Sequence, residues 1–185
     1  MRSLTRMTVV AGSIGLLAAG AAPASASAAP RATETCDSAS QGAFPRSTVL
    51  SAGPFHLSGG RQYEHTTLDQ LRRLTWYKMP LLLEAGRSAT ISIDPAFRDR
   101  AGWVAGHGGG AAPDRPGIAG TAAVVTLRAC PKGHPYHRSR MGGRDVTFWS
   151  GGIDATTVPS CVPITVRTDR GTTLRRTIPL GRTCG

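Results

Sequence analysis

One short stretch, CPKGHPYH, brings together residues that could bind a metal. Cys130, His134 and His137 follow one another at spacings of four and three residues. A thiolate with two imidazoles is a ligand set that copper or zinc accepts. The competing use of the thiol is a disulfide, because in an oxidising compartment an even number of cysteines is expected to pair. We therefore expect two disulfides and no cofactor, with the metal site as the alternative and with three pairings open among Cys36, Cys130, Cys161 and Cys184.

The second chemical feature is positive charge. The chain has 22 Lys and Arg against 11 Asp and Glu, a net charge of +11. Arginines are dense in the C-terminal part, where Arg167 and Arg175 share an outward face of the predicted strands and Arg176 is adjacent. Such a patch would attract an anionic cell-wall polymer or an acidic polysaccharide. The alternative is a solvated outer face in a chain whose Ala, Gly, Pro and Arg content reflects a GC-rich genome.

No sequence motif assigns a catalytic residue. The chain has no GxSxG elbow, HExxH pair, P-loop or zinc-type pair of CxxC motifs. His107 lies in a glycine-rich run at 106–120, which is either an exposed loop or a binding loop. The three tryptophans fill a core or form a carbohydrate platform. We lean toward a protein that is not an enzyme and keep a secreted hydrolase, with its site near His107 or His134, as the alternative.

The N-terminus has the three parts of a cleavable secretory signal. Arg2 and Arg6 precede an almost uncharged run from Met7 to Ala22, and Ala-x-Ala spacings follow. The run is too short and too rich in Gly and Ala for a membrane span, which needs about twenty apolar residues. No stable membrane span remains after signal cleavage. We expect a secreted, extracellular protein with a signal at 1–28, a flexible leader at 29–46 and one domain at 47–185.

A short helix is predicted at 66–74. Thr67 and Gln70 have the spacing of a capping box, and leucines recur every three residues. The segment has barely two turns, so tertiary packing must stabilise it. A strand that continues through residue 77 is the alternative interpretation.

Short strands separated by glycine and proline turns make up most of the remaining domain. Residues 80–83 and 87–93 predict a hairpin, because a turn-like Glu-Ala-Gly separates them and the second segment alternates apolar and polar side chains. Further strands are expected at 121–129 and 146–149. This pattern predicts a mainly β protein with little helix: a single antiparallel β-sandwich, for which an immunoglobulin-like architecture is one form.

The clearest hairpin lies near the C-terminus, and its loop length sets its register. A loop of residues 169–171 places Val166 opposite Leu174, so the apolar side chains of both strands share one face. A two-residue loop would instead pair Val166 with Thr173. We therefore predict the three-residue loop, with Gly171 in a left-handed conformation at a bulge.

This register has two consequences for polar and proline residues. Arg176 falls opposite Ile164 on the apolar face, so a bulge or the rim of the sheet must carry its side chain outward. Pro163 and Pro179 each remove a backbone donor, which suits strand edges or bulges. We therefore expect this hairpin to close one side of the sandwich.

The motifs WYKMPLLLEAG, VTLRACP, TFWSGG, SCVPITV and LGRTCG together resemble those of small secreted actinobacterial proteins of unknown function. The resemblance implies export and disulfide bonds, and it assigns no catalytic residue. The first functional hypothesis is a secreted, disulfide-stabilised binding or envelope-associated module for an anionic surface. Besides the hydrolase, a secreted protease inhibitor or antagonist is the remaining alternative.

Overall fold

The computed structural model describes residues 29–41, 48–74, 76–105, 120–135 and 139–185. The predicted signal at 1–28 lies outside these residues, as do His107 and His137. The described part is mainly β, with thirteen strands, one short α-helix and one 3-10 turn.

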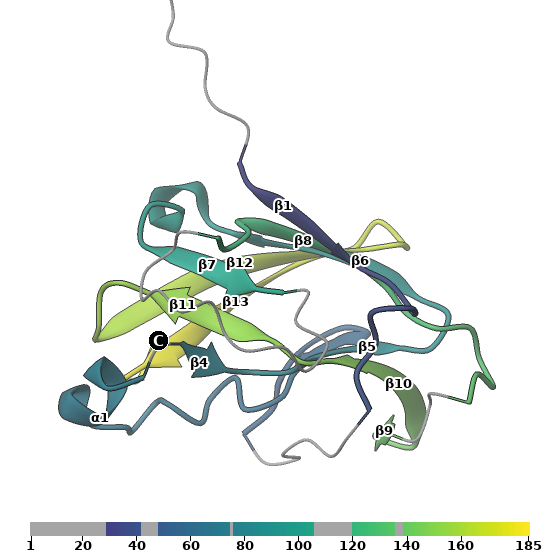
Figure 1. Ribbon diagram of the computed structural model, residues 1–185, viewed down its shortest axis with the longest axis horizontal. Coiled ribbons are helices and arrows are strands. Elements are labelled where there is room, and N and C mark those ends of the chain that lie inside the picture. Colours follow the sequence, from purple (N-terminus) through teal and green to yellow (C-terminus); the bar gives the residue numbers. More distant parts are fainter. Residues whose placement is uncertain (1–28, 42–47, 75, 106–119, 136–138) are drawn as a thin grey trace, which may run out of the picture.

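The strands form three sheets (Figure 1). Sheet A runs in the order β1 (Arg31–Glu34), β8 (Val124–Arg128), β6 (Ser88–Ile93), β12 (Ser160–Thr168) and β13 (Thr173–Leu180). Sheet B runs in the order β2 (Leu50–Ala52), β3 (Phe55–Leu57), β5 (Leu81–Glu84), β10 (Arg144–Trp149) and β9 (Ser139–Met141). Sheet C contains β4 (Tyr77–Lys78), β11 (Gly152–Ala155) and β7 (Ala101–Val104).

One apolar core is shared by all three sheets. Ile91 of sheet A, Leu83 of sheet B and Trp103 of sheet C are fully buried in the same cluster. Strand β6 alternates buried and partly exposed residues, as its sequence predicts. Burying each such large side chain contributes roughly 1.5–3 kcal/mol. The layered arrangement confirms the predicted mainly β sandwich.

The hairpin predicted between residues 80–83 and 87–93 is wrong. Strand β5 pairs with β3 and β10 in sheet B, whereas β6 pairs with β8 and β12 in sheet A. All three leucines of β5 are buried, and Leu82 packs in a second cluster with Val146 and Phe148. As the central strand of sheet B, β5 has both of its edges paired, one with β3 and the other with β10, so neither edge is left for β6. The chain therefore crosses between sheets at 85–87.

The flexible leader predicted at 29–46 is also wrong in part. Residues 31–34 form β1, which pairs in parallel with β8, so sheet A is mixed and not purely antiparallel. The sequence shows no apolar alternation here, and the contact is long-range: a disulfide from Cys36 to Cys130 holds β1 beside the end of β8.

The helix α1 (Leu68–Arg72) confirms the helical interpretation of 66–74, although it is shorter. The Thr67 N–H donates to Gln70 Oε1 at 3.1 Å, and the Gln70 N–H donates to Thr67 Oγ1 at 3.4 Å. This is the predicted capping box. Leu71 is the buried residue of the helix.

The C-terminal hairpin has the predicted register. Val166 lies opposite Leu174, residues 169–171 form the loop, and Gly171 has a φ of 75°. Only a residue without a Cβ adopts this left-handed conformation readily. Burial of the shared apolar face therefore sets the register, as the sequence predicted.

Arg176 leaves the apolar face at the rim of the sheet. It lies opposite Ile164 in β13, the edge strand of sheet A, and its Nε donates to the carbonyl of Ser51 at 2.8 Å. Pro179 also lies in this edge strand. Pro163 is in β12 beyond the residues that pair with β6, so its missing donor interrupts no pairing there.

Candidate functional site

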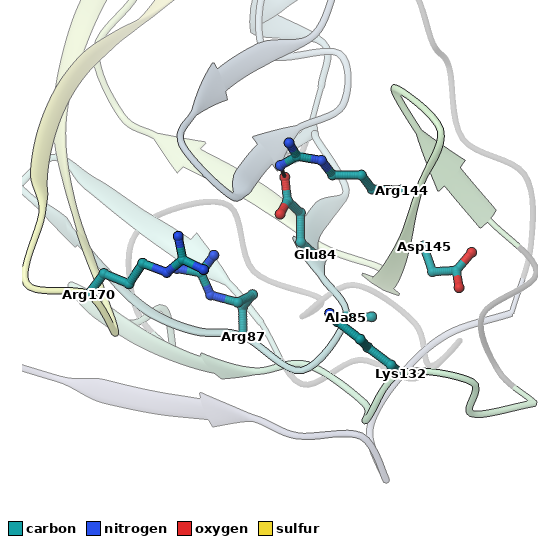
Figure 2. Close-up of a pocket in the computed structure, with 7 residues that line it drawn as sticks. All are labelled: Glu84, Ala85, Arg87, Lys132, Arg144, Asp145 and Arg170. Carbon is teal, nitrogen blue, oxygen red and sulfur yellow. Dashed lines mark hydrogen bonds and ion pairs between the residues drawn. The ribbon is translucent and has the colours of Figure 1, made fainter.

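Turns from both main sheets meet at one end of the molecule, away from α1 (Figure 1). They are the crossing between β5 and β6, the loop between β12 and β13, the turn after β8 and the start of β10. These segments border a hollow of about 460 Å³ (Figure 2). Its lining residues are Glu84, Ala85, Arg87, Lys132, Arg144, Asp145 and Arg170.

Two further hollows continue the first. One of about 250 Å³ shares three arginines and Glu84 with it, and one of about 280 Å³ shares Thr168 with the second. We call the three hollows together the basic track. Six basic side chains line it against three acidic ones: Arg87, Arg128, Lys132, Arg144, Arg167 and Arg170 against Glu84, Asp145 and Asp169.

An ion pair between Arg87 and Asp169 fixes the hairpin loop against the crossing. The Arg87 Nε donates to Asp169 Oδ2 at 2.8 Å, its terminal nitrogen donates to Oδ1, and the Ser88 N–H adds a third donor at 3.1 Å. The hydrogen bond from Arg87 lowers the pKa of the Asp169 carboxyl and raises the pKa of the guanidinium. This pair is neutral overall and positions the loop.

Two more ion pairs place their acids deeper than their arginines. Arg144 contacts Glu84 at 2.7 Å, with side chains 70% and 15% exposed, respectively. Arg140 contacts Asp145 at 3.0 Å, with side chains 70% and 32% exposed. The guanidinium groups therefore face solvent above the carboxylates, and an approaching ligand meets positive charge first.

Lys132 and Arg170 line the first hollow from two different turns (Figure 2). Both residues are exposed, and within the described chain neither forms an ion pair. Lys132 sits in a turn closed by the His134 N–H, which donates to the Pro131 carbonyl at 3.2 Å, and Gly133 there has a φ of 76°. The hollow thus holds two exposed cations that form no ion pair with a carboxylate of the described residues.

The structure separates the arginines that the sequence grouped. Arg167 lines the basic track, whereas Arg175 and Arg176 line another hollow with Arg61 and Glu64. The guanidinium of Arg176 donates to backbone carbonyls. Strand alternation predicted that these side chains face outward, but it did not predict which end of the sheet each of them lies at. Anion binding by these residues stays a prediction.

The four cysteines form two disulfides, Cys36–Cys130 and Cys161–Cys184, as the even number predicted. Because Cys130 is oxidised, the Cys130, His134, His137 metal site is not assembled in this form. His134 does lie against the first disulfide, with both ring nitrogens 3.8 Å from Cys36 Sγ.

A second histidine contact had no signal in the sequence. Ser51 Oγ and His56 Nδ1 lie 2.9 Å apart across β2 and β3. Burial lowers the pKa of the His56 imidazole below its ordinary value. Neither residue lines the basic track. The contact is a polar cross-strand pair on the outer face of sheet B.

A scan against protein-family models and searches of curated proteins and of solved structures find no match to this chain. The immunoglobulin-like topology and the resemblance to actinobacterial proteins therefore stay predictions. Among the residues that the structure describes, no helix is long and apolar enough to cross a membrane.

Proposed function

We propose that this protein is an exported, disulfide-stabilised binding module that holds an acidic polymer of the cell envelope on its basic track. The observation that carries the proposal is the pair of exposed cations, Lys132 and Arg170, in one hollow of that track. The two disulfides support an oxidising compartment, where envelope polymers are found.

A polymer fits the track better than a small anion does. The three hollows share lining residues, so successive acidic groups of one chain could occupy them in turn. Each contact between exposed charges is weak on its own. Linked contacts add through effective concentration, and their sum depends strongly on salt.

The test is binding of the full chain to dextran sulfate and to polygalacturonate, with neutral dextran as the reference polymer. The wild type is expected to bind both acidic polymers and to release them as salt rises. Reversing both exposed cations in K132E/R170E should weaken binding by at least about tenfold, because each reversed contact costs on the order of 1 kcal/mol.

A matched control separates the track from overall charge. Arg73 and Arg182 are exposed, lie outside the basic track and give the same change in net charge as R73E/R182E. This variant should weaken binding by less than about threefold, since its charges do not line the hollows and act on the ligand only through screened solvent. Equal losses in both variants, or no binding by the wild type, would refute the proposal.

A further inference from the structure

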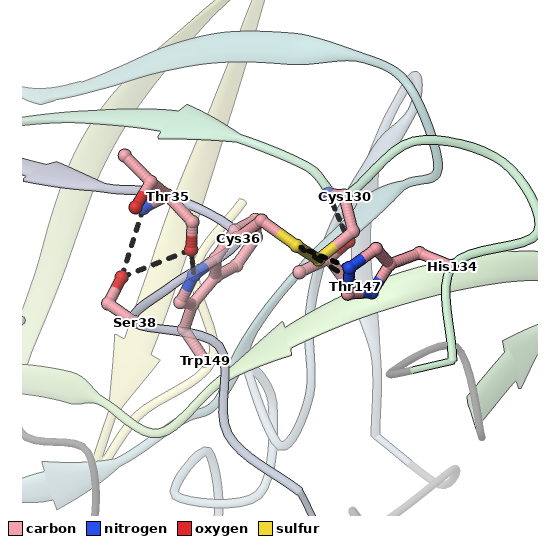
Figure 3. Close-up of a disulfide and its surroundings, with 7 residues drawn as sticks. All are labelled: Thr35, Cys36, Ser38, Cys130, His134, Thr147 and Trp149. Carbon is pink, nitrogen blue, oxygen red and sulfur yellow. Dashed lines mark hydrogen bonds between the residues drawn. A yellow bond between two sulfur atoms is a disulfide. The ribbon is translucent and has the colours of Figure 1, made fainter.

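We propose that reduction of the Cys36–Cys130 disulfide creates, together with His134, a site for one soft metal ion of the zinc(II) or copper(I) type. The two sulfur atoms and a ring nitrogen of His134 all lie within 4.8 Å of one another. Figure 3 shows the imidazole directed at the disulfide. None of its three residues lines the basic track, and the proposal does not rest on what binds there.

The distance between His134 and Cys36 is already close to the one that separates two ligands of the same metal ion. Both ring nitrogens of His134 are 3.8 Å from Cys36 Sγ. With metal bonds of about 2.3 Å to sulfur and about 2.0–2.1 Å to nitrogen, a tetrahedral site places these atoms about 3.6 Å apart. Two thiol sulfurs at van der Waals contact, about 3.7 Å, match the sulfur–sulfur edge of the same tetrahedron. Small side-chain movements would therefore place the two sulfurs and the nitrogen at three corners of a metal-centred tetrahedron.

The backbone that carries Cys130 and His134 is held by bonds other than the disulfide. The Cys130 N–H donates to Thr147 Oγ1 at 2.8 Å in a buried contact, and its carbonyl accepts from the Gly86 N–H at 2.8 Å. The turn closed between Pro131 and His134 then brings the imidazole back over the sulfurs.

The backbone on the Cys36 side is fixed in the same way. The Ala39 N–H donates to the Cys36 carbonyl at 3.1 Å, and the Thr35 N–H donates to Ser38 Oγ at 3.0 Å. The indole N–H of Trp149 donates to the Thr35 carbonyl at 2.8 Å. Each half of the site thus has local hydrogen bonds that do not depend on the sulfur–sulfur bond, and this is the backbone preorganisation that a metal site requires.

The chemistry balances with a dithiol as reductant. Its thiolate attacks one sulfur of the disulfide, its second thiol closes the reductant's own disulfide, and two protein thiols result. A divalent ion then displaces the two thiol protons, so two thiolates neutralise its charge. This neutrality suits a site where Cys130 is fully buried. Disulfide and metal are mutually exclusive, and bound metal stabilises the reduced form.

The second disulfide supplies an internal control. Cys161 and Cys184 have backbone carbonyls near their sulfurs, those of Thr183 and Arg182. Within the described chain, the Cys36, Cys130, His134 group is the one set of three such ligands that the geometry brings together. The C161S/C184S variant therefore removes two thiols without touching the proposed site.

The test titrates Zn²⁺ into the full C161S/C184S chain, reduced with dithiothreitol and freed of it without air. One ion per chain is expected for the reduced form and none for the oxidised form. Cd²⁺ in place of Zn²⁺ should give thiolate-to-metal absorbance. H134A should weaken Zn²⁺ binding by at least about tenfold. Removing a residue that only hydrogen-bonds to a metal ligand already costs about that much, and removing the ligand itself should cost no less.

Three outcomes would overturn the proposal. They are no stoichiometric Zn²⁺ on the reduced chain, Cd²⁺ binding without thiolate absorbance, and equal affinity in H134A. Near-UV circular dichroism, to which Trp149 contributes, follows the fold. If reduction alone abolishes this signal, Zn²⁺ must restore it in the parent and not in H134A, and failure to do so also counts against the site.

Discussion

The two disulfides are the same bond in very different surroundings. Cys36–Cys130 joins residues 94 apart in the sequence, has a buried half-cystine and is surrounded by side chains (Figure 3). Cys161–Cys184 joins residues 23 apart, near the open end of the β12–β13 hairpin, among backbone carbonyls. The first holds β1 and the Lys132 turn together; the second closes a local hairpin. Long-range order at the basic track should therefore depend mainly on the first.

The largest expected effect is the loss of the first disulfide. The variant C36A/C130A frees a loop of 94 residues in the unfolded chain, for which loop-closure entropy gives a loss of about 4.7 kcal/mol in the free energy of unfolding. Urea denaturation followed by tryptophan fluorescence measures it. Because the Lys132 turn begins at Cys130, binding to dextran sulfate should also weaken.

Loss of the second disulfide should cost less. In C161A/C184A the freed loop is 23 residues, which gives about 3.4 kcal/mol by the same relation. Binding to dextran sulfate should be unchanged, since neither cysteine lines the basic track. If the second variant were the less stable, or if it alone lost binding, the contrast between the two disulfides would be wrong.

The sequence predicted structure best where neighbouring segments pair. The register of β12 and β13 follows from the loop length and from the burial of Val166 and Leu174, both of which are local in the chain. The crossing at 85–87 was missed because the same Glu-Ala-Gly turn serves a hairpin or a change of sheet. The pairing of both edges of β5, with β3 and with β10, decides between them, and that pairing is a property of the assembled fold.

The candidate sites were predicted less well for the same reason. Lys132 and Arg170 are 38 residues apart in number, and only the stacking of sheets brings their turns to one hollow. Cys36 and His134 are 98 residues apart. The sequence placed His134 beside Cys130 by spacing alone, and it offered no means of choosing Cys36 as the third member.

A smaller effect is expected from the surroundings of the first disulfide. Thr147→Val removes the oxygen that accepts from the buried Cys130 N–H and keeps the side chain's shape. An unsatisfied buried donor costs about 1–3 kcal/mol, so urea denaturation should show a loss in this range. Thr165→Val, on a partly exposed position of β12, is the matched control and should change stability by less than about 0.5 kcal/mol. Equal losses in the two variants would mean that the hydrogen bond from Cys130 to Thr147 adds nothing to the stability that the disulfide provides.

The smallest effect is expected at the loop of the β12–β13 hairpin, at the end opposite to the second disulfide. Asp169→Asn replaces the carboxylate that accepts from Arg87 and from the Ser88 N–H. At pH 7 the free energy of unfolding should fall by about 1 kcal/mol, the value of a well-placed ion pair near the surface. The hairpin should therefore rely more on its disulfide than on this pair.

The pH dependence distinguishes charge from packing at Asp169. Since the bond to Arg87 lowers the folded-state pKa of this carboxyl below its ordinary 3.8, its contribution is present above pH 3.8 and is lost as pH falls toward the folded-state value. The difference between wild type and D169N should accordingly shrink below pH 3.8. Asp99→Asn, whose side chain is 83% exposed, should show almost no difference at any pH. A D169N effect that persisted unchanged in acid would assign the loop's stability to packing, and the ion pair would then add nothing to what the disulfide provides.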